Sequence, residues 1–330
     1  MIIVTGGAGF IGSNLVAGLE RHIGPDGPDL VVVDRLGSGE KWRNVAKRDL
    51  AAIIPPEGFF DFLEDSQGGV EAIFHMGAIS ATTERDADLI VRENVALPLR
   101  LWQWCTRHGT RLIYASSAAT YGDGTHGFDD DVSPAAQAAL QPLNAYGWSK
   151  HLFDRRAVKL AARKVHPPQW VGLKFFNVYG PNEYHKAGMK SVVAHITPKI
   201  QVGDGATLFK SHRPDYADGG QTRDFIHVDD VVDVMLWLYD TPTANGIFNL
   251  GTGAARSFAD LARAVFAALG QEERITYVDT PEAIRDKYQY FTQARMERLR
   301  DAGYQGQFTS LEEGVRRYVQ DYLIQEDPYR

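Results

Sequence analysis

The sequence has a single cysteine, Cys105, and no apolar stretch near the roughly 20 residues that a helix needs to cross a bilayer. One cysteine excludes a disulfide framework and a thiolate metal site, and its place in an apolar run predicts a buried side chain. No metal is expected. Basic residues are outnumbered by acidic ones, 35 against 42, so nucleic acid and anionic membranes are not the expected partners. The N-terminus enters a strand without a basic region or cleavage site, which predicts a cytoplasmic protein.

The chain has an ordinary globular composition, with 44% hydrophobic residues among 330. Short β-branched runs alternate with helical patterns, such as those from Gly12 and over Val228–Leu238. The runs predict strands at 2–4, 30–33, 72–74, 111–114, 170–174 and 246–250. Such alternation is typical of an α/β fold, a Rossmann doubly wound parallel sheet. A turn is expected at Gly24–Pro28.

Irregular segments rich in Gly, Pro, His and charge interrupt this pattern and predict a second, smaller α/β lobe. We expect a dinucleotide-binding Rossmann domain over 1–176 and about 223–250. The substrate lobe would be discontinuous, over about 177–222 and 251–330.

A glycine motif follows the first expected strand and opens a helix. Gly6 permits a tight turn, Gly9 lets the backbone approach a pyrophosphate, and Gly12 allows the helix to pack closely. The helix N-terminus then presents unpaired N–H groups to the phosphates. Asp34, at the end of the next strand, is placed to accept hydrogen bonds from the adenosine ribose. This context predicts a nicotinamide dinucleotide site.

The residues beside Asp34 do not decide between NAD and NADP as the cofactor. A carboxylate repels a 2′-phosphate and so favours NAD. Arg35, together with Lys41, would instead hold that phosphate and favour NADP. The sequence allows either cofactor.

Tyr146 and Lys150 are four residues apart and therefore share one helical face. When a hydride leaves a carbon that carries a hydroxyl group, a base must remove the hydroxyl proton. Tyrosine, with a pKa of about 10, is a poor base near neutrality. A nearby ammonium and a positive nicotinamide ring would lower that pKa in a site closed to water. Ser117, at the end of an expected strand, is placed to hydrogen-bond the same substrate oxygen.

These motifs resemble the extended short-chain dehydrogenase/reductase family, which modifies nucleotide sugars, over nearly the full chain. The resemblance rests on GGAGFIG, Asp34, the segment 75–78, Ser117, YxxxK and the segment 223–228. It implies a Ser117/Tyr146/Lys150 triad, with Lys150 also bonding the nicotinamide ribose. Further cofactor contacts are implied at Phe10, Ile11, Met76, Gly77, Ala78, Ser80, Asn94, Val178 and Lys186.

Ala118 and Ala119 follow Ser117, where the family's 4,6-dehydratases carry an Asp-Glu pair, so elimination is not expected. Segments 79–84, 176–186, 191–195 and 288–293 are similar to those of the subgroup of ADP-glycero-manno-heptose 6-epimerases. That subgroup supplies heptose for lipopolysaccharide. The resemblance implies inversion at C6″ through a transient ketone, an ADP-heptose substrate and a homo-oligomer, suggested to be a pentamer.

Lys186 is the distinguishing residue of this resemblance. Inverting a stereocentre outside the sugar ring needs two acid/base groups, and the resemblance implies Tyr146 and Lys186. The alternative for Lys186 is a diphosphate contact, and His185 beside it is expected to be a loop residue. Substrate contacts are implied at Ser117, Asn177, Gly188, His195, Phe209, Arg223 and Tyr288. Arg223 is a diphosphate clamp or a structural cap, and Tyr288 a substrate contact or a core residue.

The sequence departs from the family pattern at three places. Met76 replaces a commonly acidic residue, Ala187-Gly188 replaces a Gly-Ser pair, and the 211–221 loop is longer than usual. That loop would alter the glycosyl group accepted or form a lid. Two other functions are considered: a 4-epimerase or reductase acting on another nucleotide sugar, and a silent dinucleotide sensor. A sensor has no need of a base beside the nicotinamide.

Overall fold

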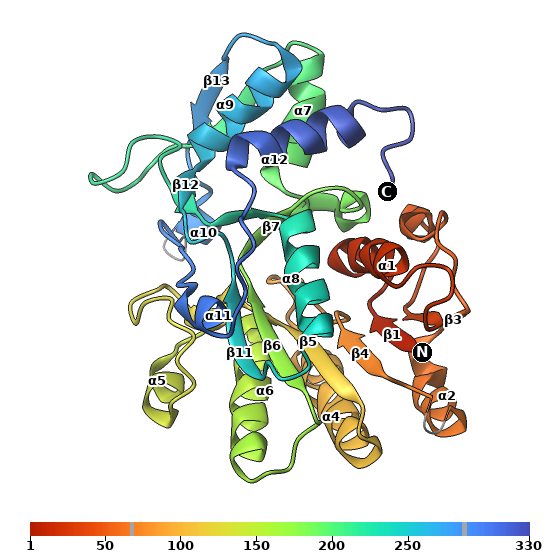
Figure 1. Cartoon of the computed structure of the whole chain (residues 1–330). Coiled ribbons are helices and arrows are strands. Elements are labelled where there is room, and N and C mark those ends of the chain that lie inside the picture. The colour runs from red at the N-terminus through yellow and green to blue at the C-terminus, as the bar shows by residue number, and fades with distance from the viewer. Residues whose placement is uncertain (67–68, 286–288) are drawn as a thin grey trace.

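The computed structural model describes residues 1–66, 69–285 and 289–330. Its centre is a seven-stranded parallel sheet with the strand order β11-β6-β5-β4-β1-β2-β3 (Figure 1). The strands are β1 (Ile2–Thr5), β2 (Leu30–Val33), β3 (Ala52–Ile54), β4 (Ala72–His75), β5 (Arg111–Ser117), β6 (Trp170–Phe175) and β11 (Gly246–Leu250). The predicted fold class is confirmed, and each of the six expected strands is present.

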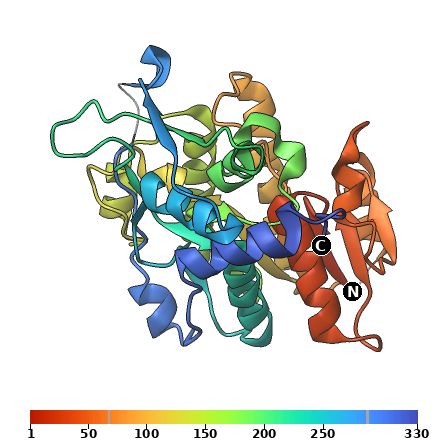
Figure 2. The same cartoon turned by 90° about the horizontal axis from the view of Figure 1, so that it is seen from above.

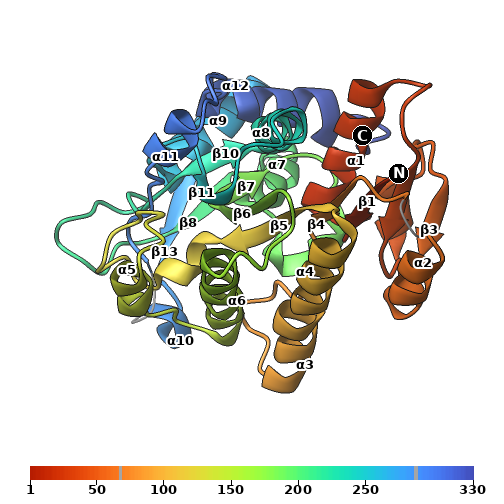
Figure 3. The same cartoon turned by 60° about the horizontal axis from the view of Figure 1, so that its bottom comes forward.

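Helices cover both faces of this sheet (Figure 3). Successive residues of a strand point to opposite faces, so Ile2 and Val4 pack under one layer of helices and Ile3 under the other. The first layer contains α1 (Phe10–Ile23) and α8 (Val228–Asp240). The second contains α2 (Phe59–Asp65), α4 (Leu97–His108) and α6 (Ala145–Ala162), with α3 (Ala87–Val91) beside α6. This double burial explains why the strands are apolar throughout.

Two smaller expectations are also met. Gly24 ends α1 with a φ of 69°, and the chain turns through Gly24–Pro28 before β2. Cys105 lies in α4 with no exposed surface, and burial raises the pKa of its thiol. Within the described ranges, no helix combines the length and the hydropathy needed to cross a membrane.

A second core lies above the carboxyl ends of the sheet strands (Figures 1 and 2). It is built from α7 (Val192–Gln201), α9 (Phe258–Leu269) and α12 (Leu311–Tyr318) and from the paired strands β8 (Ala206–Phe209) and β13 (Ile275–Val278). Short pairs join it to the sheet domain: β7 (Asn177–Tyr179) with β10 (Phe225–His227), and β9 (Thr222–Arg223) with β12 (Arg256–Ser257). The shorter helices are α5 (Pro134–Ala139), α10 (Glu282–Arg285) and α11 (Glu297–Asp301). The predicted domain boundaries stay a prediction.

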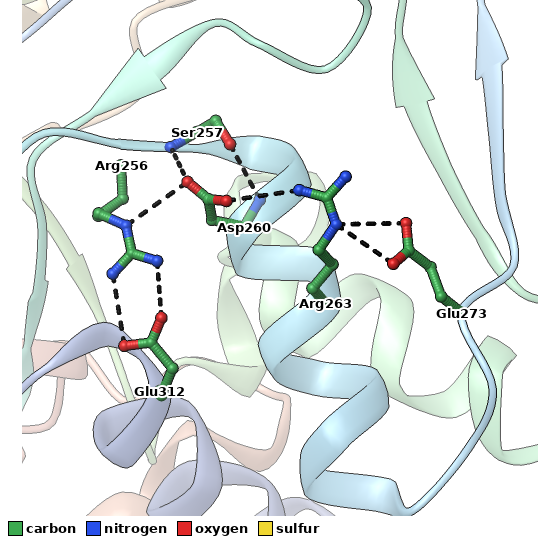
Figure 4. A network of polar contacts seen from close by, with 6 residues as sticks. All are labelled: Arg256, Ser257, Asp260, Arg263, Glu273 and Glu312. Atoms are coloured by element: carbon green, nitrogen blue, oxygen red, sulfur yellow. Dashed lines mark hydrogen bonds and ion pairs between the residues drawn. The ribbon is translucent and has the colours of Figure 1, made fainter.

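Helix α9 is fixed at its first turn by a polar network (Figure 4). The Ser257 hydroxyl accepts from the Asp260 N–H, and the Asp260 carboxylate accepts from the Ser257 N–H, which is a capping box. Arg256 links this turn to Glu312 of α12, at 2.6 Å. Exposed ion pairs contribute little free energy, so the cap is the main anchor. The network thereby fixes Phe258, the first residue of α9.

Candidate active site

A cleft of about 860 Å³ is lined by residues at the carboxyl ends of the sheet strands and by residues of the second lobe. Ligands of open α/β sheets bind at this edge. Many of the residues predicted from the sequence line the cleft. They are Gly6, Gly9, Phe10, Ile11, Gly12, Asp34, Lys41, Met76, Gly77, Ala78, Ser80, Ser117, Tyr146, Lys150, Asn177, Val178 and Lys186.

The turn from β1 to α1 has room for little except backbone. Gly6 adopts a φ of +65°, and a Cβ at Gly12 would lie only 2.1 Å from the Gly6 carbonyl oxygen. Helix α1 begins at Phe10, and its N-cap, Gly9, has no side chain. The first N–H groups of the helix therefore face the cleft without a capping side chain, as a phosphate-binding site requires.

Asp34 follows β2 and is held by hydrogen bonds from the turn between β1 and α1 and from a lysine. One oxygen accepts from the Ala8 N–H at 2.9 Å, and the other accepts from the Lys41 ammonium at 2.6 Å. Lys41 lines the cleft. Arg35 does not, because its guanidinium turns to Glu57, at 2.6 Å, and lowers the pKa of that carboxyl. Of the two cations predicted beside the ribose, Lys41 lines the cleft and Arg35 does not, and their binding roles stay predictions.

Asn94 lies beneath the cleft rather than in its wall. Its amide donates to the Ile79 carbonyl and to the Ser149 hydroxyl, and its oxygen accepts from the Ile79 N–H. It therefore ties the loop after β4 to α6. His75, the last residue of β4, shares a 2.6 Å hydrogen bond with Thr5, and burial lowers its pKa to about 3.

Helix α6 brings Tyr146 and Lys150 to the same cleft as Ser117, the last residue of β5. Asn144 caps the helix by accepting from the Gly147 N–H at 2.8 Å. A Cβ at Gly147 would lie 2.6 Å from the Ala119 carbonyl oxygen, so glycine lets the helix approach the end of β5 closely. The Lys150 ammonium donates to the Ala115 carbonyl at 2.8 Å. The predicted triad is thus assembled in space.

The electrostatics of the triad differ from the expectation in one respect. Burial lowers the pKa of Lys150 to about 8. Burial also raises the pKa of Tyr146, and the lowering effect of Ser117 does not offset it. The side chains of the protein therefore do not themselves make Tyr146 acidic. The expected lowering depends on charge that a bound nicotinamide ring would add.

Asp154 is a buried carboxylate on α6, the helix that carries Tyr146 and Lys150. It accepts hydrogen bonds from the Tyr114 hydroxyl at 3.0 Å and the Ser116 hydroxyl at 2.7 Å, and it lies 3.4 Å from the Lys174 ammonium. Lys174 in turn donates to Thr120 at 2.7 Å. Buried charges need such partners, and this network fixes α6 against β5 and β6.

Lys186 reaches the cleft from a short 3₁₀ turn, η5 (Tyr184–Met189), and its ammonium lies 5.2 Å from the centre of the Phe10 ring. Asn182, with a φ of 71°, anchors this turn by donating to the Ser13 hydroxyl and to the Asn44 carbonyl. Burial lowers the pKa of Lys186, and the charge of Glu183 opposes that effect. Lys186 is therefore placed at the start of α1, next to the dinucleotide site.

Several predicted substrate residues lie outside the cleft wall. His195 and Gly188 are joined at 3.3 Å, between the imidazole and the carbonyl. Phe209 ends β8. Arg223 is buried, donates to the Thr222 and Gln289 carbonyls, and lies 5.5 Å from the Phe258 ring. Tyr288 lies outside the described residues. Their binding roles stay predictions.

The 211–221 loop projects at the left of Figure 1. Arg213 pairs with Asp215 at 2.9 Å and lies over the rings of Tyr216 and Tyr290, and the His212 N–H donates to the Tyr290 hydroxyl. None of the residues 211–221 lines the cleft described above. Its role as a lid or specificity element stays a prediction.

The cleft also contains residues that sequence reasoning missed. Phe258 and Leu261 of α9 and Phe225 of β10 form an apolar part of the wall, and Lys190 adds a second cation near Lys186. Nothing local in the sequence distinguishes these residues from core or surface positions. Only the packing of the second lobe over the sheet brings them to the cleft.

Comparison with known proteins agrees with this geometry. The model of the NAD dependent epimerase/dehydratase family matches residues 2–251. A curated protein of Nitratidesulfovibrio vulgaris (strain DP4), named ADP-L-glycero-D-manno-heptose-6-epimerase, is 50% identical, with 100% of each chain covered. A crystal structure of Helicobacter pylori ADP-L-glycero-D-manno-heptose-6-epimerase is similar with a TM-score of 0.77 and 27% identity, over 97% of this chain and 95% of that one.

A further similar structure is MoeE5 in complex with UDP-glucuronic acid and NAD, with a TM-score of 0.74, 26% identity and 97% of each chain covered. The family match spans both the glycine turn and the Tyr146/Lys150 pair of this chain. The chain therefore belongs to the NAD dependent epimerase/dehydratase family, in the group whose curated members are named ADP-L-glycero-D-manno-heptose-6-epimerase.

Proposed function

We propose that this protein converts ADP-D-glycero-β-D-manno-heptose to ADP-L-glycero-β-D-manno-heptose through a transient 6″-ketone. The observation that carries the proposal is that Tyr146 and Lys186, from two different elements, line one cleft beside the dinucleotide turn. The names of the full-length relatives support the same substrate. The reaction is an isomerisation without net redox change.

The cleft fits a nicotinamide dinucleotide on structural grounds. The close-packed glycine turn, the uncapped start of α1 and the carboxylate of Asp34 suit its pyrophosphate and its ribose. When bound, such a cofactor accepts a hydride and returns it. Tyr146 would remove the substrate hydroxyl proton, Ser117 would orient the oxygen, and Lys150 would hold the cofactor ribose and favour the phenolate.

Lys186 would be the second acid/base group. The two epimers direct the C6″ hydroxyl differently, so the ketone must rotate its side chain and meet a donor on another side. Lys186 stands on η5, a different element from α6, and its pKa is lowered by burial, which makes it a better proton donor. Its place over Phe10 also suits a phosphate contact, and mutant kinetics separate these roles.

We propose NADP as the cofactor. Lys41 lies in the cleft wall against Asp34 and offsets the negative charge that would repel a 2′-phosphate. Mass spectrometry of the cofactor that stays bound through purification would identify it. A Lys41→Ala variant should retain less NADP relative to NAD. Equal loss of both would argue against this preference.

The homo-oligomer, which the resemblance suggests to be a pentamer, and the cytoplasmic location stay predictions. Light scattering of the purified chain tests the first, since a pentamer has five times the chain mass of 36.6 kDa.

The function itself is tested with purified protein and either heptose epimer. We expect each to give the same mixture of both epimers, with no consumption of added NADPH or NADP. Turnover of a UDP- or dTDP-hexose in place of the heptose would contradict the assignment.

A further inference from the structure

Lys174 is a fully buried lysine that the proposed reaction leaves unused. It lies on β6, in register with Ser116 of β5, and neither Lys174 nor its charged partner Asp154 has exposed side-chain surface. Taking two charges out of water is costly, and apolar side chains of similar volume often fill such a place with no loss of stability. Stability alone therefore does not account for the lysine at this position.

The Lys174 ammonium contacts two elements that carry the triad. It lies 3.4 Å from the Asp154 carboxylate of α6, and it donates to the Thr120 hydroxyl at 2.7 Å. Thr120 belongs to η4 (Ala118–Tyr121), the short 3₁₀ turn that directly follows Ser117. Lys174 thereby links the helix of the tyrosine–lysine pair to the turn at the end of β5.

The Thr120 hydroxyl extends this contact to Ser117. A hydroxyl has a single hydrogen to donate, whereas an ammonium can only donate. Because Lys174 donates to the Thr120 oxygen, the Thr120 hydrogen is directed to the Ser117 carbonyl, at 2.9 Å. The Ser117 hydroxyl oxygen also accepts from the Ala119 N–H at 3.1 Å. Ser117 is thus held at its main chain by Thr120 and at its side chain by Ala119.

We propose that Thr120 and Lys174 are positioning residues for the reaction: Lys174 fixes the Thr120 hydroxyl, and that hydroxyl holds the Ser117 main chain so that the Ser117 side chain stays beside Tyr146. The inference rests on the proposed role of Ser117 in the triad. Ser117 and Tyr146 line the same cleft, and a hydrogen bond with Ser117 lowers the pKa of Tyr146. A displacement of about 1 Å in such a pair is enough to slow a reaction strongly.

The test replaces Thr120, because an apolar residue in place of Lys174 would leave the Asp154 carboxylate buried without its cation. Thr120→Val keeps the shape of the side chain and removes both hydrogen bonds, whereas Thr120→Ser keeps both and removes a methyl group. We expect kcat for heptose epimerisation to fall at least about ten-fold in Thr120→Val, with little change in KM, and to stay near normal in Thr120→Ser. Packing alone would give the opposite order, because only the serine variant leaves a cavity.

A double-mutant cycle with Ser117→Ala shows whether Thr120 acts through Ser117. In the Ser117→Ala background, Thr120→Val should change kcat by less than about two-fold, since the side chain that Thr120 positions is already absent. The inference would be overturned by a near-normal kcat in Thr120→Val, by an equal loss in Thr120→Ser, or by the same loss in both backgrounds.

A second measurement needs no turnover. The absorbance of the Tyr146 phenolate is followed against pH in the cofactor-bound protein, as the difference from the same protein carrying Tyr146→Phe. Thr120→Val should raise the midpoint by at least about half a unit, because the displaced Ser117 hydroxyl no longer stabilises the phenolate, and it should raise nothing in the Ser117→Ala background. Lys150, Asp154 and the cofactor are the same in every variant, so their charges do not cause the difference.

This titration also separates the inference from the proposed function. A raised midpoint in a protein that does not interconvert heptoses would support the positioning role and defeat only the proposed function. An unchanged midpoint in Thr120→Val would overturn the inference.

Discussion

The two sides of the cleft are built in different ways. On one side, Tyr146 and Lys150 stand on a long regular helix, and Lys150 is buried. On the other, Lys186 is half-buried on a short turn, next to Ala187, which has φ 48° and ψ −121°. The first, regular side is fixed by local helix geometry. The second, irregular side depends on hydrogen bonds between residues distant in sequence, such as that between Asn182 and Ser13.

This difference predicts how the two sides respond to change. Tyr146 and Lys186 are both partly exposed, but Tyr146 is held on a capped helix and Lys186 on a short turn. A reacting group that is already held in the right geometry contributes more to catalysis than one that must be brought into position. Removing Tyr146 should therefore cost more activity than removing Lys186.

The largest effect is expected for Tyr146→Phe. The ring still packs, but the proton acceptor is gone, so kcat for heptose epimerisation should fall roughly a thousand-fold. The amount of cofactor bound through purification should stay unchanged. Trp148→Phe, on the exposed side of the same helix, is the control and should retain near-normal kcat. A Tyr146→Phe variant with activity within ten-fold of wild type would contradict the assigned role.

Lys186→Ala should lower kcat by roughly a hundred-fold, with a smaller change in KM. The effect is smaller than for Tyr146 because Lys186 is held on a short turn rather than on a regular helix. Lys199→Ala, an exposed lysine at the end of α7, serves as the matched control. A near-normal kcat with a raised KM would instead make Lys186 a substrate or phosphate contact.

The pH dependence of stability at His75 tests how deeply the regular side of the cleft is buried. In the unfolded chain its pKa is about 6.5, and in the folded chain about 3, so between these values the unfolded state binds more protons. Stability should thus fall as pH decreases through this window, by up to about 1.4 kcal/mol per unit for this histidine. Urea unfolding should show that the free energy of unfolding of His75→Asn changes less steeply with pH between 6.5 and 5 than that of the wild type. An unchanged slope would show that His75 does not cause it.

The smallest effect concerns the backbone of the irregular side. Ala187→Gly should stabilise the protein by about 1 kcal/mol, because glycine adopts the positive φ of this position without strain. The matched substitution Ala267→Gly, at an exposed position in α9, should destabilise by about the same amount. Thermal unfolding of both variants shows whether each substitution stabilises or destabilises the protein. Equal destabilisation by both would mean that Ala187 is not strained.

The regular side was also the more predictable one. The strand pattern, the glycine turn and the spacing of Tyr146 and Lys150 express periodicities that the sequence displays directly. The position of Lys186 was expected only from a family resemblance, because Asn182 holds its turn through hydrogen bonds with Ser13 and Asn44, which are distant in sequence.

Other parts could not be foreseen for similar reasons. Phe258 and Leu261 reach the cleft only because the second lobe packs over the sheet. The raised pKa of Tyr146 results from burial that a helical spacing does not reveal. Arg35 was expected at the cofactor phosphate, but Glu57, which is 22 residues away, holds its guanidinium.

The central claim is that the two sides cooperate in a redox inversion, and the fate of the hydrogen on C6″ tests it most directly. The protein is incubated in D₂O with one ADP-heptose epimer, and the products are examined by NMR and mass spectrometry. A hydride that leaves and returns to the same carbon predicts both epimers with no deuterium at C6″. Deuterium at C6″, or no second epimer, would contradict the account.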